Sequence, residues 1–282
     1  MQHRPVSARR SLGIFLFVAT VLGSIAAACG PADTDVGPRP PCPADAGTCA
    51  TTSGGAGSAG GGQGGGGSGG GGQLSDDVRG SVGVLNSPSF STISPYAGAA
   101  TIFAPSKSGA PMQAPYGETQ SFELADVMSG RTWFFVRDET VGATGILSTH
   151  SVLSVPTGSD VMLPVLDRNL LGSIAGMLPA PTTLQDGKAQ LVLLFVRNGQ
   201  PLSGVSVSTA LPGAVMAYDE GIGLYSNQTT LTGPAGVALV LNVDAPVQAE
   251  LRNLTLTDVN GLGYMIQLPV QSNAATFAAF EL

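Results

Sequence analysis

Hydrophobic and polar residues alternate in short runs along the first half of the folded part. In 118–127, for example, Phe122 and Leu124 alternate with polar neighbours, which is the period of a strand with one buried face. Gly, Pro, Ser and Asn separate these runs, a pattern that predicts strands joined by turns. The runs are 78–86, 97–105, 118–127, 129–138, 145–155 and 160–167.

The run over 132–136 differs from the others because apolar side chains occupy both of its faces. Trp133 and Phe135 fall on one face, and Phe134 and Val136 fall on the other. A strand that is covered on both faces lies inside a sheet rather than at its edge. We therefore predict a central strand here.

Residues 167–178 break the alternation. Asp167 is placed to cap a helix, and Pro179 follows its end. The apolar residues at helical spacing are Leu170, Leu171, Ile174, Met177 and Leu178. The pattern predicts one short helix across the junction between the halves, followed by a linker over 179–188.

Strand patterns return in the second half. Residues 191–196 are all apolar, as expected of a strand buried on both faces, and Asn198-Gly199 supplies a turn. Residues 236–243 alternate regularly. Their apolar face holds Val237, Leu239, Leu241 and Val243.

Residues 247–270 indicate two strands joined by a hairpin turn at Asn260-Gly261. The apolar phase slips between Leu251 and Leu254, which predicts a β-bulge near Asn253. Residues 275–282 then form the closing strand.

The first 28 residues have the organisation of a secretory signal. Residues 1–10 carry three arginines and no acid, and 11–28 carry no charge and end in alanines. The stretch Ala26-Ala27-Ala28-Cys29 resembles the lipobox of bacterial lipoproteins, which implies cleavage before Cys29 and a lipid on its thiol. Plain secretion and an uncleaved apolar anchor are the open alternatives. By resemblance to Gram-negative lipoproteins, Gly30 after the cysteine favours the outer membrane.

Residues 29–73 predict a disordered tether. In 53–73, 14 of 21 positions are glycine, so no side chains offset the entropy of ordering. Cys42 and Cys49 are expected to form a small disulfide loop within this tether. A metal pair is disfavoured because neither histidine nor a further cysteine is near them.

Charge narrows the range of partners. Charged residues make up only 11% of the chain, and its formal net charge is −7. Removal of 1–28 takes away three of the 12 Lys+Arg and none of the 19 Asp+Glu, which leaves 9 − 19 = −10. An acidic chain that is poor in lysine has no electrostatic footprint for nucleic acid.

Short motifs in both halves resemble bacterial immunoglobulin-like or prealbumin-like sandwiches of the carboxypeptidase regulatory-like type. The motifs are "NGQPLSGVSVS" (198–208), "TGPAGVALVLNV" (232–243) and "VMSGRTWFFV" (127–136). They mark turns between strands, so the resemblance implies a fold and no chemistry. The family contains adhesins, spacers in surface proteins and accessory domains of enzymes.

The expected fold class is therefore all-β, with two consecutive sandwiches joined by a short helix behind the tether. The expected division is a signal peptide (1–28), a tether (29–73), a first sandwich (74–167), a helix and linker (168–188) and a second sandwich (189–282).

Some members of this family cross-link themselves through a lysine in the first strand and an asparagine in the last. Here Arg197 stands in the equivalent region of the first strand, and it cannot act as the amine. Lys188 precedes that strand, Lys107 has no convincing partner, and Asn273 lies near the last strand. The sequence does not favour a cross-link.

Catalytic chemistry finds little support. Any Ser-His-Asp arrangement would have to use His150, whose neighbour Ser151 points to the opposite face of a strand. The stretch "GSIAG" (172–176) has its serine one place too early for a nucleophile elbow. We interpret His150 as an ordinary strand or surface histidine.

The acidic residues also lack the neighbouring ligands that a metal site requires. Asp258 and Asn260 faintly resemble a calcium loop but are explained by a hairpin turn. Asp138-Glu139 and Asp219-Glu220 are adjacent acids that we interpret as solvated loop charges, with calcium as the open alternative. No cofactor and no metal site is predicted.

Together these features predict a membrane-anchored lipoprotein of the bacterial cell envelope with non-catalytic sandwiches for display, adhesion or binding of envelope polysaccharide or protein. The alternative is an enzyme, or its accessory subunit, with an unrecognised site. The candidate ligand loops are 86–97, 105–118 and 210–230. The last of these holds the candidate contact residues Tyr218, Asp219, Glu220 and Tyr225, for which a structural role is the competing interpretation.

Overall fold

The computed structural model describes residues 76–128, 130–140, 145–155, 160–208 and 211–282. The predictions made for the signal peptide, Cys29, the tether and the Cys42–Cys49 disulfide lie outside the described residues. In the described part the chain is all-β with one short helix, as the sequence predicts.

Eight strands and the helix come from the first half and the junction. They are β1 (Asp76–Leu85), β2 (Ile93–Pro95), β3 (Ala100–Ala104), β4 (Met112–Tyr116), β5 (Phe122–Val127), β6 (Gly130–Asp138), β7 (Ile146–Val155), β8 (Asp160–Asp167) and α2 (Arg168–Met177).

The second half supplies the remaining strands. They are β9 (Lys188–Arg197), β10 (Gln200–Pro201), β11 (Ser206–Ser208), β12 (Val215–Gly221), β13 (Leu224–Ser226), β14 (Val237–Asp244), β15 (Glu250–Thr257), β16 (Gly263–Val270) and β17 (Ala274–Glu281).

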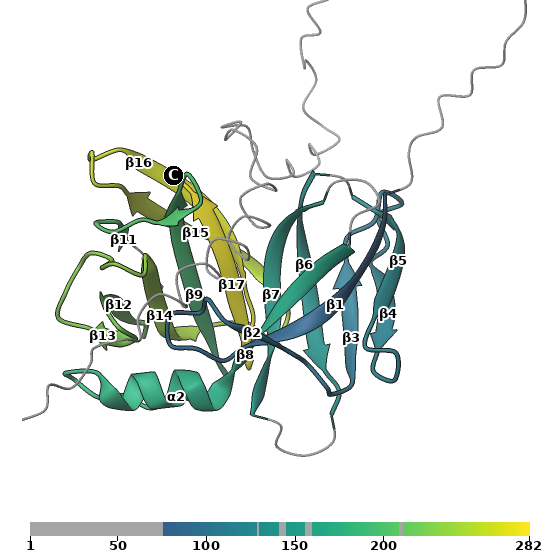
Figure 1. Ribbon diagram of the computed structural model, residues 1–282, viewed down its shortest axis with the longest axis horizontal. Coiled ribbons are helices and arrows are strands. Elements are labelled where there is room, and N and C mark those ends of the chain that lie inside the picture. Colours follow the sequence, from purple (N-terminus) through teal and green to yellow (C-terminus); the bar gives the residue numbers. More distant parts are fainter. Residues whose placement is uncertain (1–75, 129, 141–144, 156–159, 209–210) are drawn as a thin grey trace, which may run out of the picture. The chain divides into compact units, whose positions relative to one another are not determined.

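One 14-stranded sheet passes through both halves, and a three-stranded sheet lies apart from it (Figure 1). The main path of the large sheet runs β13-β12-β14-β9-β17-β7-β6-β3-β4, and the small sheet has the order β11-β15-β16. The link between the halves is the parallel pairing of β17 with β7, from Ala274 opposite Ser148 to Phe277 opposite Ser151. The closing strand of the chain is therefore hydrogen-bonded to the first half as well as to β9.

The first core fills the space between β1, β5 and β8 on one side and β3, β4 and β6 on the other. Its largest fully buried side chains include Ile102, Leu124, Phe134 and Leu163. As predicted, β6 is a central strand, paired with β3 and with β7. Phe134 and Val136 face this core, whereas the opposite face of β6 is only half covered.

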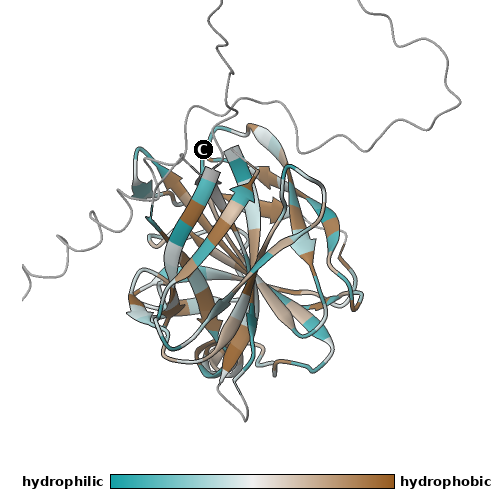
Figure 2. Cartoon of the chain, turned by 90° about the vertical axis from the view of Figure 1, so that its right-hand side faces the viewer, coloured by the Kyte–Doolittle hydropathy of each residue, from teal (hydrophilic) through white to brown (hydrophobic). Residues whose placement is uncertain are grey.

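Strand β9 separates two further cores, so its unbroken apolar run is explained. Leu191, Leu193 and Phe195 face the core under the three-stranded sheet. Val192, Leu194 and Val196 face the core covered by α2, which contributes buried residues Leu171, Ile174 and Ala175. Figure 2 shows hydrophobic and hydrophilic residues interspersed along individual strands, in keeping with faces of different exposure.

Several elements are predicted correctly from local patterns of residues. The carboxylate of Asp167 accepts hydrogen bonds from the amides of Asn169 and Leu170 and caps α2. At the β9–β10 turn, Asn198 and Gly199 adopt φ of 52° and 69°, the left-handed conformation that a two-residue hairpin requires. The hairpin expected around Asn260-Gly261 joins β15 to β16.

Two predictions about strand irregularities are wrong. The pairing of β15 with β16 runs without a shift from Glu250 to Thr257, so there is no bulge near Asn253. The apolar phase slips there because Leu251 is exposed on the outer face. The irregularity lies instead in β14, where the register shifts between Val240 and Val243. Val243 therefore packs in the core under the three-stranded sheet, on the opposite face of β14 from the one predicted for it.

The irregularity in β14 is built around a buried asparagine. Asn242 has φ of 59° and is 2% exposed. Its Oδ1 accepts from the Gln185 amide at 2.9 Å, and its Nδ2 donates to the Thr183 carbonyl at 2.9 Å. The predicted linker is thereby fixed to the sheet.

Candidate recognition surface

A row of rings crosses three adjacent strands on the face of the large sheet that points away from the first core. Phe103 on β3 lies opposite Phe135 on β6, and Phe135 lies opposite His150 on β7. Residues directly opposite each other project from the same face. The ring centroids of Phe103 and Phe135 are 6.1 Å apart, and those of Phe135 and His150 are 4.2 Å apart.

The two phenylalanine rings of this row do not belong to any of the three hydrophobic cores. Phe103 and Phe135 are half-buried and belong to none of the three apolar clusters. Trp133, on the same face of β6, packs only against the rim of the core under the three-stranded sheet. Exposed Arg131 and Arg137 flank the rings. We call these five side chains the aromatic face.

Each arginine covers a ring: Arg137 covers Phe103 of the aromatic face, and Arg131 covers Phe280 of β17 beside it. The Arg137 guanidinium carbon lies 4.9 Å from the Phe103 centroid, and that of Arg131 lies 5.3 Å from the Phe280 centroid. Such cation–π contacts at exposed sites contribute about 0.5–1 kcal/mol. The surface is therefore apolar along its middle, with an arginine at each margin.

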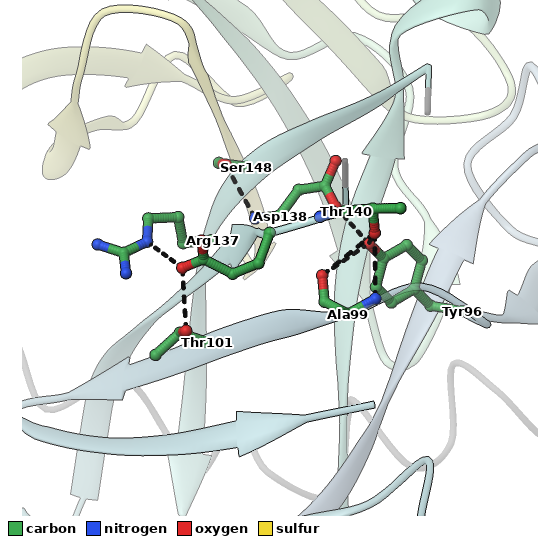
Figure 3. A network of polar contacts seen from close by, with 8 residues as sticks. Tyr96, Ala99, Thr101, Arg137, Asp138, Thr140 and Ser148 are labelled. Carbon is green, nitrogen blue, oxygen red and sulfur yellow. Dashed lines mark hydrogen bonds and ion pairs between the residues drawn. The ribbon is translucent and has the colours of Figure 1, made fainter. Parts of the chain in front are cut away.

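Arg137 is held in place by a polar network at the end of β6 (Figure 3). Its Nε donates to Glu139 Oε1 at 2.5 Å, and Thr101 Oγ1 donates to the same oxygen at 3.0 Å. These two hydrogen bonds, that from Arg137 above all, hold the pKa of Glu139 below its usual value. Thr101 of β3 and Glu139, which directly follows β6, thus fix the outer arginine.

A second part of this network centres on Tyr96. Its hydroxyl donates to Asp138 Oδ1 at 2.5 Å and lies 3.0 Å from Thr140 Oγ1, as Figure 3 shows. Burial, and then the hydrogen bond to Asp138, raise the pKa of Tyr96 to about 12. The Ala99 amide donates to Thr140 Oγ1 at 3.1 Å. The turn before β3 is therefore tied to the end of β6.

The turn leaves room only for a glycine at position 98. A Cβ on Gly98 would lie 2.3 Å from the Tyr96 hydroxyl and 2.6 Å from Thr140 Oγ1. The network therefore depends on the absence of a side chain at this position.

His150 closes the inner end of the row of rings. It is 6% exposed, and its Nε2 lies 2.9 Å from Gln271 Oε1. Gln271 Nε2 donates to the Val247 carbonyl, so its Oε1 is the acceptor and His150 Nε2 carries the proton. Burial lowers the pKa of His150 to about 4. The ring is therefore neutral and enclosed at neutral pH.

The serines near His150 do not form a nucleophile–base pair with it. Ser148 Oγ accepts from the Asp138 amide at 3.1 Å. Ser151 is 1% exposed, and its hydroxyl has no hydrogen-bond partner among the described residues. As neighbours in β7, Ser151 and His150 point to opposite faces.

The four candidate contact residues lie on strands rather than in a long loop. Tyr218, Asp219 and Glu220 belong to β12, and Tyr225 belongs to β13. Tyr218 is 3% exposed, and its hydroxyl lies 3.1 Å from both the amide and the carbonyl of Val207. The other two candidate loops contain β2 and β4.

Asp219 serves the turn that precedes β14. It is 2% exposed, and its carboxylate accepts from the amides of Gly233, Ala235 and Val237 at 3.1, 2.7 and 2.7 Å. Glu220 beside it is exposed.

Tyr225 is also committed to the fold. It is 6% exposed, and its hydroxyl donates to the Pro88 carbonyl at 2.5 Å. Burial, with a smaller effect of the Asp219 charge, raises its pKa above the usual range for tyrosine. The bond ties the segment after β1 to the edge of the large sheet.

A shallow hollow of about 390 Å³ lies beside this bond. It surrounds the tip of the β12–β13 hairpin, where Ile222 is fully exposed and has φ of 56°. The other lining residues are Pro88, Ser89, Gly221, Gly223, Pro234 and Ala235. None of them is charged, so the hollow offers no acid, base or metal ligand.

The Asp258 carboxylate shapes the hairpin turn between β15 and β16. Its Oδ1 accepts from the amides of Asn260 and Leu262, and its Oδ2 accepts from Arg197. Burial opposes ionisation, but these hydrogen bonds outweigh it and hold the pKa of Asp258 below its usual value. No cluster of metal-ligating side chains occurs in the part of the chain that the structure describes. No helix there is long and apolar enough to cross a membrane.

The residues considered for a covalent cross-link have other contacts. The Lys188 ammonium pairs with the Asp244 carboxylate. Asn273 Oδ1 accepts from the Gly187 amide at 2.7 Å. Arg197 donates to Asp258 and to the Leu282 carbonyl. Lys107 lies in the turn after β3, where its amide donates to the Asp126 carbonyl.

Sequence reasoning missed the aromatic face, although a signal was present. The residues Arg131, Trp133, Phe135 and Arg137 alternate along one strand and share a face. The apolar side chains on both faces of 132–136 led only to the prediction of a central strand. That Phe103 stands opposite Phe135 depends on strand register, which the local sequence does not contain.

Comparison with known proteins adds little to this picture. No family model matches the chain, and no curated protein matches it. Solved structures that match include the Bacillus anthracis TIE protein, with 12% identity and a TM-score of 0.24, where the match covers 74% of this chain and 34% of that one.

Two further matches are pilins. The Streptococcal ancillary pilin has 10% identity and a TM-score of 0.22, with 73% of this chain and 68% of that chain covered. The shaft pilin SpaA from Lactobacillus rhamnosus GG has 10% identity and a TM-score of 0.23, with 74% and 99% covered. At TM-scores below 0.5 these matches carry no argument for function.

Proposed function

We propose that the chain is a non-catalytic lipoprotein of the bacterial cell envelope, in which a lipid on Cys29 and a glycine-rich tether display a β head that binds an envelope component. One observation carries the non-catalytic part. The groups that catalysis would recruit, His150, Asp219 and Asp258, are each buried and engaged in hydrogen bonds that hold the fold. The aromatic face, by contrast, offers half-buried rings at the surface, which supports a binding role.

The anchoring part rests on the sequence. The apolar segment, the alanines before Cys29 and the 14 glycines in 53–73 are what a lipid-anchored, outward-reaching head requires. Each buried methylene contributes about 0.8 kcal/mol, so several acyl chains hold a protein firmly on a membrane. The acidic chain itself would be repelled by anionic lipid.

The anchoring test compares the full chain with its Cys29→Ala variant after cell fractionation. We expect the wild type in the membrane fraction and the variant released from it. Cys42→Ala is the matched control, because it removes a thiol from the same tether and leaves the site of lipidation intact. A Cys29→Ala variant that stays with the membrane contradicts the proposal.

The binding test incubates the purified chain with isolated envelope polysaccharide and, separately, with envelope protein fractions. The variant Phe135→Ser removes a half-buried ring of the aromatic face, and Leu251→Ser removes an exposed apolar side chain elsewhere. We expect binding that Phe135→Ser weakens and Leu251→Ser leaves unchanged. Hydrolysis of either material that His150→Ala abolishes would contradict a non-catalytic role.

A further inference from the structure

The three-stranded sheet ends in a strand whose outer edge is open. Among the described residues, β16 pairs with β15 and with no other strand. It is eight residues long, its register with β15 is unbroken, and its sequence GYMIQLPV contains no charge. A long, regular, uncharged edge of this kind is a template for pairing with another strand.

The backbone groups that point out of this edge can be identified. The Asp258 amide donates to the Leu262 carbonyl at 3.0 Å. Because hydrogen-bonded and non-hydrogen-bonded pairs alternate along an antiparallel ladder, the even-numbered residues of β16 face β15. The amides of Met265 and Gln267 therefore face the open edge. In agreement with this alternation, the Pro269 carbonyl points outward to Thr276 Oγ1, at 2.5 Å.

The other strands at the margins of the described sheets are protected. The strands β2, β11 and β13 have three residues each, and β10 has two. Strand β4 carries Pro115, and β5 carries Glu123 and Asp126. Short length, proline and charge are the usual means by which proteins block pairing at an edge. In the described part of the chain, β16 lacks all three over Gly263–Leu268.

The space beside this edge lies over the aromatic face. The strands of the small sheet lie over those of the large sheet in the same sequence from one side to the other. At one side β11 lies over β12, where Tyr218 contacts Val207. At the other side β16 lies over β17, where Thr276 contacts Pro269. Beyond β17 the large sheet continues with β7 and β6. A strand added to β16 would therefore lie above β7 and β6, where Trp133 and Phe135 are incompletely covered.

We propose that a single extended segment of a partner protein adds to the edge of β16 and covers the aromatic face. The segment carries apolar side chains at alternate positions, because those side chains must contact Trp133 and Phe135. Acidic side chains near its ends complement Arg131 and Arg137, which are exposed and lie six positions, or about 20 Å, apart along β6. This inference deepens the proposed non-catalytic binding role and rests on it.

The geometry disfavours two other occupants. A second copy that paired through its own β16 would bring its large sheet into the place that β7 and β6 already fill. The tether is also unsuited, because the glycines of 53–73 have low strand propensity and no side chains for Trp133 and Phe135. A separate strand of alternating character fits the space without either conflict.

The test uses a fluorescent synthetic peptide in which threonine and valine alternate between terminal aspartates, titrated with the purified full chain. We expect saturable binding measured by anisotropy. A peptide of the same sequence that is N-methylated at every threonine and valine keeps the side chains but lacks their backbone donors, so we expect it not to bind. No saturable binding of the first peptide, or equal binding of both, would overturn the proposal.

Variants at the edge locate the binding. Met265→Pro removes an outward amide without breaking the ladder to β15, a position where proline is tolerated. We expect it to weaken binding about tenfold, whereas Met265→Val, which keeps the amide, leaves binding unchanged. Gln267→Pro with Gln267→Val repeats the comparison if Met265→Pro does not fold.

The remaining outcomes are also decisive. Unchanged binding by folded Met265→Pro and Gln267→Pro variants would place the peptide elsewhere and overturn the proposal. Self-association of the wild type that Met265→Pro abolishes would show that the occupant is a second copy. Failure of the peptide test leaves the fractionation of Cys29→Ala unaffected, so the two proposals fail separately.

Discussion

His150 makes the stability of the folded head depend on pH below neutrality. Burial lowers its pKa from 6.5 to about 4, so the folded chain resists a proton that the unfolded chain accepts. Between these two values the unfolded state binds more protons, and stability falls as the pH falls. The contribution of the neutral ring is complete above pH 6.5 and is lost as the pH drops towards 4.

The size of the effect follows from the gap between the two pKa values. At about 1.4 kcal/mol per pH unit, the full loss is about 3 kcal/mol, of which about 2 kcal/mol has been lost by pH 5. This is a large fraction of the 5–15 kcal/mol by which domains are typically stable. A side chain that is 6% exposed justifies treating most of this as stability.

Urea unfolding at pH 7.5 and pH 5 measures the effect, with His150→Gln as the comparison. The glutamine keeps a donor for Gln271 and does not titrate in this range. Carboxylates and His3 contribute equally to both proteins, so they cancel when the two pH dependences are subtracted. We expect the wild type to lose about 2 kcal/mol more than the variant. Equal losses in the two proteins would refute the argument.

Three further predictions concern stability. Tyr96→Phe removes the hydroxyl bound to Asp138 and should lower the free energy of unfolding by about 1–2 kcal/mol in urea titrations, whereas Tyr264→Phe should change it by less than about 0.5 kcal/mol. Asp219→Asn leaves buried amides without full acceptors and should cost about 2 kcal/mol by the same measurement; a loss no greater than that of exposed Glu220→Gln would contradict the role assigned to Asp219. Reduction of Cys42 and Cys49 should leave the melting temperature of the head unchanged in calorimetry, because a disulfide that closes so small a loop outside the predicted sandwiches removes little entropy from the unfolded chain. A fall of several degrees would mean that the tether packs on the head.

The sequence predicts the elements of this fold better than their assembly. Capping by Asp167, the turn at Asn198-Gly199 and the buried strand at 191–196 are encoded within a few neighbouring residues, and each was found. The irregularity in β14 depends on contacts between Asn242 and the distant linker, so no local pattern marks it.

The candidate site shows the same division. Adjacent acids such as Asp219 and Glu220 look alike in the sequence, yet one is enclosed by amides of the next turn and the other is exposed. Leu251 led to the prediction of a bulge because a single exposed apolar residue looks, in the sequence, like a shift in the alternation of buried and exposed positions. The aromatic face and the open edge arise from the order of distant strands, and that order is a property of the folded chain alone.

The position of β17 has a consequence for how the chain folds during its synthesis. Strand β17 lies between β9 and β7, so a chain that lacks 274–281 leaves both neighbours with bare edges. Such edges invite aggregation and cleavage. Because β17 follows β7 by more than a hundred residues in the sequence, the sheet of the first half is completed only after 274–281 have been synthesised. Deletion of 274–281 is therefore expected to yield a chain that aggregates or is degraded.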